Sequence, residues 1–272
     1  IRAIAVEIEL DTSQGRSPIS PWIYGYHGSA VPTQGARAIR LGGNRFSTYN
    51  WENNASNAGS DYYNYNDDYL TARVGIAPTD PQAEEPARAL TTLLDPFLGS
   101  GHMPGFALVT VPLTGYVARD KNGPVSAAES APSVRWDEVI ARKGRAFSAT
   151  PDHLDGHVYI DEMVHALLQR YGSASAGGVQ GYSLDNEPEL WSRMHQRVHV
   201  LDTGCAELVQ RSTTCADAIK SVDPAAQVFG PASYGWHAFM NLQDAPDWSA
   251  VRGEHRWFPS WYLEQMAAAE RS

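Results

Sequence analysis

Residues 179–191 read VQGYSLDNEPELW, and this stretch decides both the fold and the place of the chemistry. Its first half is a short apolar run, which is typical of a buried strand. The run leads directly into Asp185, Asn186, Glu187 and Pro188. In a parallel α/β barrel, catalytic groups stand at the carboxyl ends of the strands, and a glutamate beside an asparagine is suited to protonating a glycosidic oxygen. We therefore predict a parallel α/β protein in which Glu187 is a catalytic acid.

The rest of the chain repeats a unit of short apolar strand, long loop and amphipathic helix, which predicts a parallel sheet. The expected strands are residues 22–26, 38–41, 106–111, 179–184 and 227–229, and the expected helices are residues 83–98, 159–171, 206–222 and 259–270. Connections that leave the strands are long and those that return to them are short, which favours an α/β (β/α)8 TIM barrel. A doubly wound sheet is the alternative, but Gly42-Gly43 is followed by Asn44-Arg45 and not by the start of a dinucleotide-binding helix.

The number of units is smaller than a complete barrel requires. The pattern accounts for only the first five β/α units, whereas a TIM barrel has eight. We therefore expect residues 19–272 to form the N-terminal part of a TIM-barrel domain, with the remainder on a second polypeptide or outside this sequence. Residues 4–10 alternate between apolar and polar side chains, so residues 1–18 are expected to give an N-terminal strand to a separate small β-sheet domain. The chain begins at Ile1 and not at methionine, which indicates processing and a removed export signal.

Composition excludes several classes of partner. The chain has 272 residues and a formal net charge of −10, so neither nucleic acid nor an anionic membrane is an expected partner. It also lacks an apolar run of the length that spans a bilayer. The eight Trp, thirteen Tyr and seven Phe residues suit sugar binding, although most aromatic side chains pack in cores. Cys205 and Cys215 are separated by about 15 Å of predicted helix, too far for a disulfide, so both are expected to be unpaired thiols.

Several longer segments resemble glycoside hydrolase family 44, a family of enzymes that cleave β-1,4-glucans. They are ISPWIYG at residues 19–25, RLGGNRFSTYNWENNASN at 40–57, DYYNYNDDYL at 61–70, VTVPLTGYVARD at 109–120, YSLDNEPELW at 182–191 and FGPASYG at 229–235. The resemblance implies a (β/α)8 barrel with a small β-sandwich domain, to which residues 4–10 contribute a strand. It also implies a retaining mechanism in which Glu187 is the acid/base glutamate. The nucleophile glutamate is then expected beyond residue 272.

Three polar residues are candidate substrate-binding groups. The amide of Asn186 is suited to donating to the sugar 2-hydroxyl at the cleavage point, and the alternative is an Asx turn before the proline. Asn44 and Arg45 follow the second predicted strand. Arg45 is suited to keeping a nucleophile carboxylate ionised, and the alternative is an ion pair that fixes the loop. Arg40, within the strand, and Glu189, beyond the proline, are interpreted as structural and loop residues.

Aromatic side chains in the same loops are candidate platforms for sugar rings. Trp51, in the YNWENN loop, is the first choice, and core packing is the alternative. Tyr116, Trp191 and Tyr234 also lie just beyond predicted strand ends and are weaker candidates for substrate binding, as is Trp236.

Catalysis is expected to need no metal and no cofactor. The loop with Asp61, Asn64, Asn66, Asp67 and Asp68 is rich in oxygen ligands, so a structural calcium ion is considered there, although the spacing is not that of an EF-hand. His153 and His157 are four residues apart, as are His195 and His199, but neither pair has the glutamate of a zinc protease motif. The sequence also has no nucleophile elbow for acyl transfer.

The sequence therefore predicts a secreted, extracellular, retaining endo-β-1,4-glucanase that acts on cellulose-type or xyloglucan-type chains. Glu187 would serve first as the acid and then as the base, about 5–5.5 Å from the nucleophile. The expected partners are a β-glucan polysaccharide or oligosaccharide and the C-terminal part of the same enzyme as a separate polypeptide. The alternative is a β-glucan-binding protein, or an inactive fragment, that holds a glucan without cleaving it.

Overall fold

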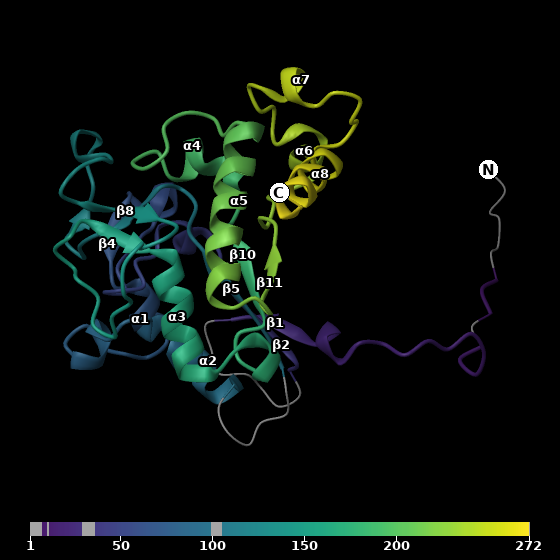
Figure 1. The fold of residues 1–272 in the computed structure, drawn as a ribbon, viewed down its shortest axis with the longest axis horizontal. Coiled ribbons are helices and arrows are strands. Elements are labelled where there is room, and N and C mark those ends of the chain that lie inside the picture. Colours follow the sequence, from purple (N-terminus) through teal and green to yellow (C-terminus); the bar gives the residue numbers. More distant parts are fainter. Residues whose placement is uncertain (1–6, 10, 29–35, 99–104, 272) are drawn as a thin grey trace.

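A computed structural model describes residues 7–9, 11–28, 36–98 and 105–271. Its centre is a five-stranded sheet in which every neighbouring pair is parallel. The strands are β1 (Gly25–His27), β2 (Ala38–Leu41), β5 (Phe106–Val111), β10 (Gly181–Leu184) and β11 (Gln227–Phe229). Their spatial order follows their order in the sequence (Figure 1). The order of the described strands does not reverse, as it would in a doubly wound sheet.

Four long helices alternate with these strands. They are α2 (Arg88–Leu98), α3 (Ile160–Tyr171), α5 (Cys205–Val222) and α8 (Phe258–Glu270), and α3, α5 and α8 pack side by side (Figure 1). Strand residues Ile39, Val109 and Tyr182 are buried with the apolar sides of the helices in one core. Side chains alternate across a strand, so the residues between them lie on the opposite face of the sheet. Arg40 is one of these, and Phe229 on that face is 38% exposed.

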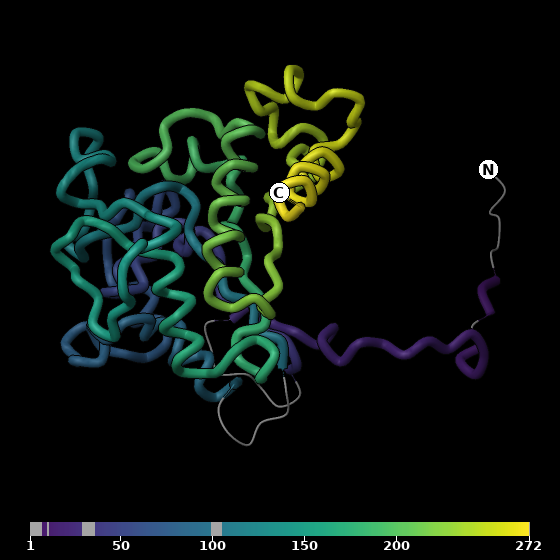
Figure 2. The backbone as a smooth tube through the Cα atoms, in the orientation of Figure 1, coloured from purple at the N-terminus to yellow at the C-terminus, as the bar shows by residue number. Residues whose placement is uncertain are grey.

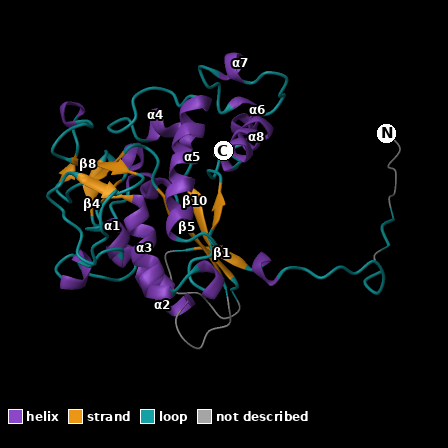
Figure 3. Ribbon diagram, viewed as in Figure 1, coloured by secondary structure: helices purple, strands orange, loops and turns teal. Residues whose placement is uncertain are grey.

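The long connections carry two smaller three-stranded sheets, which lie apart from the central sheet (Figure 3). One contains β3 (Ser56–Asn57), β4 (Tyr65–Asp67) and β7 (Gly123–Pro124), and the other contains β6 (Tyr116–Ala118), β8 (Trp136–Ile140) and β9 (His157–Tyr159). Short helices α1 (Tyr69–Arg73), α4 (Trp191–Met194), α6 (Trp236–Asn241) and α7 (Trp248–Val251) lie in the same connections. The 3-10 turns are η1 (Pro21–Ile23), η2 (Asn44–Thr48), η3 (Gly59–Tyr62), η4 (Pro81–Glu84), η5 (Ala127–Glu129), η6 (Ala174–Ala176) and η7 (Pro188–Leu190).

Most of the predicted elements are confirmed, and the differences have local causes. The strand expected at residues 22–26 is displaced to β1, because Ser20 caps a 3-10 turn over the residues before it. The helix expected from residue 83 begins at Arg88. Pro86 disfavours helical geometry at the residue before it, and Glu85 is extended.

The N-terminal strand expected at residues 4–10 lies mostly outside the described residues. Within it, residues 7–9 have no regular secondary structure. The adjoining described segment runs away from the sheet as an extended tail (Figure 2). Cys205 and Cys215 both lie in α5 as buried free thiols. No helix among the described residues is long and apolar enough to cross a membrane.

Candidate active site

The carboxyl end of β10 turns sharply through two left-handed residues. Asp185 has φ 67° and Glu187 has φ 48°, which is uncommon for residues other than glycine. Asn186 between them pairs with Ala232 beyond β11, and the backbone N–H of Glu187 donates to the Ala232 carbonyl at 2.6 Å. Such conformations cost on the order of 1–3 kcal/mol each and persist only where their surroundings fix them. Residues 185–187, which we call the acid segment, are therefore held in place by the residues around them.

Asp185 provides part of that support. Its carboxylate is fully buried and accepts from the backbone N–H groups of Leu113 at 2.5 Å and Asn186 at 2.6 Å, and from the hydroxyl of Ser47. Burial raises the pKa of Asp185, and these donors oppose the rise. The side chain thus ties the loops that follow β2 and β5 to the end of β10. Sequence reasoning missed this role, because the donors are 72 and 138 residues away in the chain.

Asn186 is fixed by Arg40, so this arginine is more than the structural residue that the sequence predicts. Nη2 of Arg40 donates to Oδ1 of Asn186 at 2.8 Å. A guanidinium has no acceptor, so this contact identifies the carbonyl end of the asparagine side chain. The amide end remains directed at other acceptors, and it forms a hydrogen bond that favours the charged form of Glu187.

Glu187 is half-buried, and its pKa is raised from the ordinary value. Burial is the main cause, because a poorly hydrated site disfavours the carboxylate. The positive charge of Arg40 and the hydrogen bond from Asn186 act in the opposite direction, while the negative charge of Asp61 adds to the rise. A carboxyl group whose pKa is raised in this way remains protonated nearer to neutral pH, as a general acid must.

Glu189 lies in η7, within the connection after β10, as the sequence predicts for a loop residue, but it is buried. Its side chain is only 5% exposed, and Oε1 accepts from the backbone N–H of Tyr234 at 2.5 Å. Oε2 is buried without a hydrogen-bond partner among the described residues. Burial raises the pKa of Glu189, and the charges of Glu187 and Asp185 raise it further. This carboxyl group holds the loop after β11 against the acid segment.

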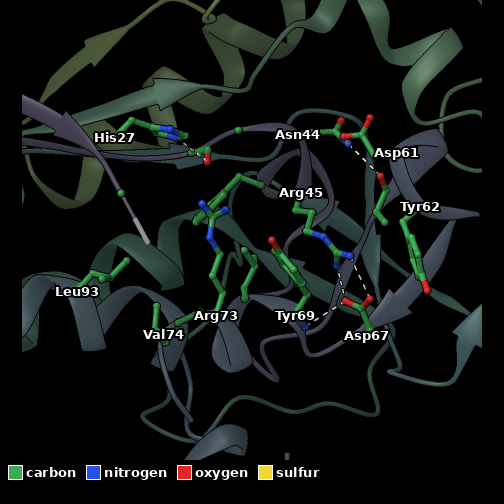
Figure 4. Close-up of a pocket in the computed structure, with 17 residues that line it drawn as sticks. His27, Asn44, Arg45, Asp61, Tyr62, Asp67, Tyr69, Arg73, Val74 and Leu93 are labelled. Carbon is green, nitrogen blue, oxygen red and sulfur yellow. Dashed lines mark hydrogen bonds and ion pairs between the residues drawn. The ribbon is translucent and has the colours of Figure 1, made fainter. Parts of the chain in front are cut away.

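A cavity of about 520 Å³ opens where β1 and β2 end (Figure 4). Asn44 lies on its rim and donates through Nδ2 to Asp61 at 2.8 Å, and Asp61 is close enough to Glu187 to influence its pKa. Tyr62 and Tyr69 also line the cavity (Figure 4). Asn44, a predicted substrate-binding residue, therefore lines a cavity at the same end of the parallel strands as Glu187.

Arg45 also lines this cavity, but its guanidinium is already engaged. Both of its terminal nitrogens bond the carboxylate of Asp67, with Nη2 to Oδ2 at 3.1 Å, and it lies 4.2 Å from the ring centre of Tyr69. The structure thus has the ion pair that fixes the loop, which is the alternative to contact with a nucleophile. It also argues against calcium in this loop, because Asp61 and Asp67 turn to Asn44 and Arg45. No group of three or more His, Cys, Asp or Glu side chains within the described ranges is arranged to hold a metal ion.

The predicted aromatic platforms are divided by burial. Trp51 is 1% exposed and Trp191 is 0% exposed, so neither offers a ring face to a sugar; both are core residues, and further polypeptide would only cover them more. Tyr116 is partly buried in β6. Tyr234 is 63% exposed beyond β11 and keeps a free ring surface, and its neighbour Trp236 is 68% exposed.

The fold and site define an α/β protein with a half-buried glutamate of raised pKa at the carboxyl end of a parallel strand. Residues 55–272 match the model of glycoside hydrolase family 44. The chain belongs to this family.

Three similar proteins illustrate the relationship. The chain is 47% identical to a "Beta-mannanase/endoglucanase A" of Caldicellulosiruptor saccharolyticus, over 98% of the chain and 20% of that protein. It is 46% identical to an "Endoglucanase A" of Paenibacillus lautus, over 97% of the chain and 37% of that protein. The structure of a Paenibacillus polymyxa family 44 xyloglucanase with xyloglucan superimposes with a TM-score of 0.88 at 46% identity, covering 94% of this chain and 49% of that one. The chain thus spans half or less of the length of each.

Proposed function

We propose that the protein is a retaining, endo-acting β-1,4-glucanase in which Glu187 is the general acid and base. The observation that carries the proposal is the environment of Glu187. It stands at the carboxyl end of β10 with a pKa raised by burial, next to an asparagine whose orientation Arg40 fixes. Membership of family 44 and the endoglucanase names of two relatives support the same activity.

The five parallel strands are, in our proposal, the first five units of a (β/α)8 barrel. Their sequential order and their alternation with helices support it. Residues 19–272 would form the N-terminal part of the barrel, and residues 1–18 would give a strand to a β-sandwich domain. The nucleophile glutamate would then lie beyond residue 272 and face Glu187 at about 5–5.5 Å, as a retaining mechanism requires.

The reaction would proceed in two displacements. In the first, Glu187 donates its proton to the glycosidic oxygen while the nucleophile carboxylate attacks the anomeric carbon, so that the C–O bond breaks and a glycosyl-enzyme forms. In the second, the Glu187 carboxylate removes a proton from water as the water oxygen attacks the same carbon, so that the bond to the nucleophile breaks and its carboxylate is released. The side-chain amide of Asn186 would donate to the sugar 2-hydroxyl, a contact that strengthens in the transition state.

The substrate that we propose is a soluble β-glucan of the cellulose or xyloglucan type. The family 44 xyloglucanase with xyloglucan supports a polysaccharide ligand, and the exposed rings of Tyr234 and Trp236 near the acid segment suit pyranose faces. Because such polymers are found outside the cell, we also propose that the enzyme is secreted.

The test is the pair Glu187→Gln and Glu187→Ala in the full-length protein. Hydrolysis of xyloglucan and carboxymethyl cellulose should fall by about 10²- to 10⁴-fold, the usual contribution of a general acid, while glucan binding is retained. With 2,4-dinitrophenyl cellobioside, which needs no acid, Glu187→Ala plus azide should yield the β-glycosyl azide, because azide attacks the glycosyl-enzyme without a base.

Exposed Glu84, which pairs with Lys121, provides the control. Glu84→Gln should hydrolyse both polymers at the wild-type rate. Wild-type turnover by Glu187→Gln would remove Glu187 from this role. Binding of glucan by the wild-type protein without any hydrolysis would favour a binding protein instead.

A further inference from the structure

Behind the acid segment lies a cluster of side chains that the proposed reaction does not use. His199 follows α4, and Glu207 and Arg211 lie one turn apart on α5. Oε1 of Glu207 is bonded by Nε2 of His199 at 3.0 Å and by Nε of Arg211 at 3.0 Å, so one carboxylate oxygen joins two donors. We call these three residues the Glu207 cluster.

The cluster contacts Trp191, which lies on the C-terminal side of the acid segment. The ring of Trp191 is fully buried, four residues after Glu187. The ring of His199 packs on it with centres 5.2 Å apart, and the guanidinium carbon of Arg211 lies 5.9 Å from the indole centre. Glu207 thus bonds two of the groups that contact this indole.

The cluster also reaches the N-terminal side of the segment. Nη1 of Arg211 donates to the carbonyl of Leu113 at 2.7 Å, and the N–H of the same Leu113 donates to Oδ2 of Asp185 at 2.5 Å. The arginine also packs closely on the backbone, since a Cβ atom on Gly115 would lie 3.0 Å from Nη1. Asp185 is two residues before Glu187 and Trp191 is four residues after it. The contacts of the cluster therefore reach both sides of Glu187.

The charge of Glu207 suits this position. The hydrogen bond from His199 is the main cause that lowers the pKa of Glu207 to about 2, and Arg211 lowers it further. The carboxylate therefore remains ionised at the pH values at which Glu187 titrates. Two left-handed residues in the acid segment require firm surroundings, and this cluster supplies them from outside the cleft.

We propose that Glu207 is a positioning residue, which acts through His199 and Arg211 on Trp191 and Asp185 to hold the Glu187 carboxyl group at the glycosidic oxygen. The inference rests on the proposed function of Glu187. A positioning role and a purely stabilising role of Glu207 predict different kinetics. A misplaced acid slows substrates that need protonation of the leaving group, whereas loose packing slows all substrates alike.

The experiment compares Glu207→Ala and Glu207→Gln with the wild type in the full-length protein. Each is assayed on xyloglucan oligosaccharides, whose leaving group needs a proton, and on 2,4-dinitrophenyl cellobioside, whose leaving group does not. For Glu207→Ala we expect kcat on the oligosaccharides to fall about tenfold or more with KM within about twofold, and kcat/KM on the dinitrophenyl substrate, which reports the first displacement alone, to change by less than about twofold. Glu207→Gln keeps an acceptor for one donor and should recover part of the loss.

The matched control is Asp217→Asn on the same helix. Asp217 is exposed and pairs with Arg142, away from the cluster. It should behave as the wild type on both substrates. Equal losses on both substrates in Glu207→Ala and Glu207→Gln, or no loss on either, would overturn the inference.

A structural readout covers the case in which the proposed function itself fails. The crystal structure of Glu207→Gln should show displacement of Arg211 from Leu113 and a shifted Glu187 carboxyl group. An unmoved Glu187 would overturn the positioning role whether or not the protein hydrolyses glucan. Wild-type protein that cleaves neither substrate would instead reject the proposed function.

Discussion

At the scale of single residues, the charge that governs Glu187 is the guanidinium of Arg40. It lies within β2 on the face opposite the core, where it bonds Asn186 and draws the pKa of Glu187 down against the effect of burial. Arg40 therefore has two separable effects. One is the geometry of the asparagine amide, and the other is the protonation of the acid.

Replacing Arg40 with Met should reveal both effects. Loss of the positive charge raises the pKa of Glu187, because the larger of the two effects that offset burial and the charge of Asp61 is then removed. A general acid acts in its protonated form, so the alkaline limb of the kcat/KM profile should move to higher pH. Loss of the hydrogen bond to Asn186 should lower kcat by roughly ten- to a hundredfold. The measurement is the pH dependence of xyloglucan hydrolysis.

Arg40→Lys serves as the control for that change. It keeps the charge but not the planar fork, so kcat should fall while the alkaline limb stays in place. An Arg40→Met profile with an unmoved alkaline limb would contradict the assigned electrostatic effect.

The sequence placed Glu187 and Asn186 together because they are adjacent in the chain and follow an apolar strand. It could not assign Arg40, because strand alternation shows which face a residue occupies but not which loop lies above it. The same limit applies to Trp51 and Trp191. Their positions after strand ends indicated the cleft, but the burial of a ring depends on neighbours that are distant in the sequence.

At the scale of elements, η3 and α4 approach each other closely. Gly59, the first residue of η3, has φ 59°, and a Cβ atom there would lie 2.1 Å from the backbone carbonyl oxygen of Met194. Backbone cannot move aside as the end of a flexible side chain can. The close approach brings His195 beside the loop that carries Asn44.

Gly59→Ala should therefore be strongly destabilising. The left-handed backbone alone costs about 1 kcal/mol for alanine, and the clash should bring the total to about 3 kcal/mol or more. Gly75→Ala is the matched control, because Gly75 has φ 87° but nothing within 4 Å of the position that a Cβ atom would take. This variant should lose only the cost of the left-handed backbone, about 1 kcal/mol. Urea denaturation of both variants provides the comparison; similar losses would show that η3 and α4 adjust to each other.

Elements were more predictable than their packing. Strands β2, β5 and β11 begin and end at the predicted residues, because short apolar runs in a repeated strand-and-helix pattern carry their signal in their own residues. The small sheets in the long connections were not predicted. Their strands are two to five residues long, and they are held by pairings such as that of Asn66 with Gly123, which the chain pattern does not contain.

At the scale of the whole molecule, two buried groups set opposite limits on stability as pH changes. Burial, with the charges of Asp155, Glu162 and Asp137, raises the pKa of Glu52 to about 8. Burial lowers the pKa of His195 to about 4. The folded state thus prefers a protonated Glu52 and a neutral His195.

The sign of each effect follows from which state binds more protons. Glu52 binds its proton more tightly when folded, so its contribution is complete below pH 4.5 and is lost as the pH rises through 8. His195 binds its proton more weakly when folded, so its contribution is complete above pH 6.5 and is lost as the pH falls through 4. Between pH 4.5 and 6.5 the two slopes cancel, and outside that window the stability falls.

We therefore expect the combined contribution of these two groups to the free energy of unfolding to be nearly constant from pH 4.5 to 6.5 and to fall by about 2 kcal/mol between pH 6.5 and 8, since each pH unit contributes about 1.4 kcal/mol. Glu52→Gln mimics the protonated side chain and should remove the alkaline fall while leaving the acid fall unchanged. Urea denaturation at several values from pH 4 to 8.5 measures both. If the free energy of unfolding of Glu52→Gln fell equally at alkaline pH, other groups would cause that fall. The high pKa of Glu52 would then not limit stability.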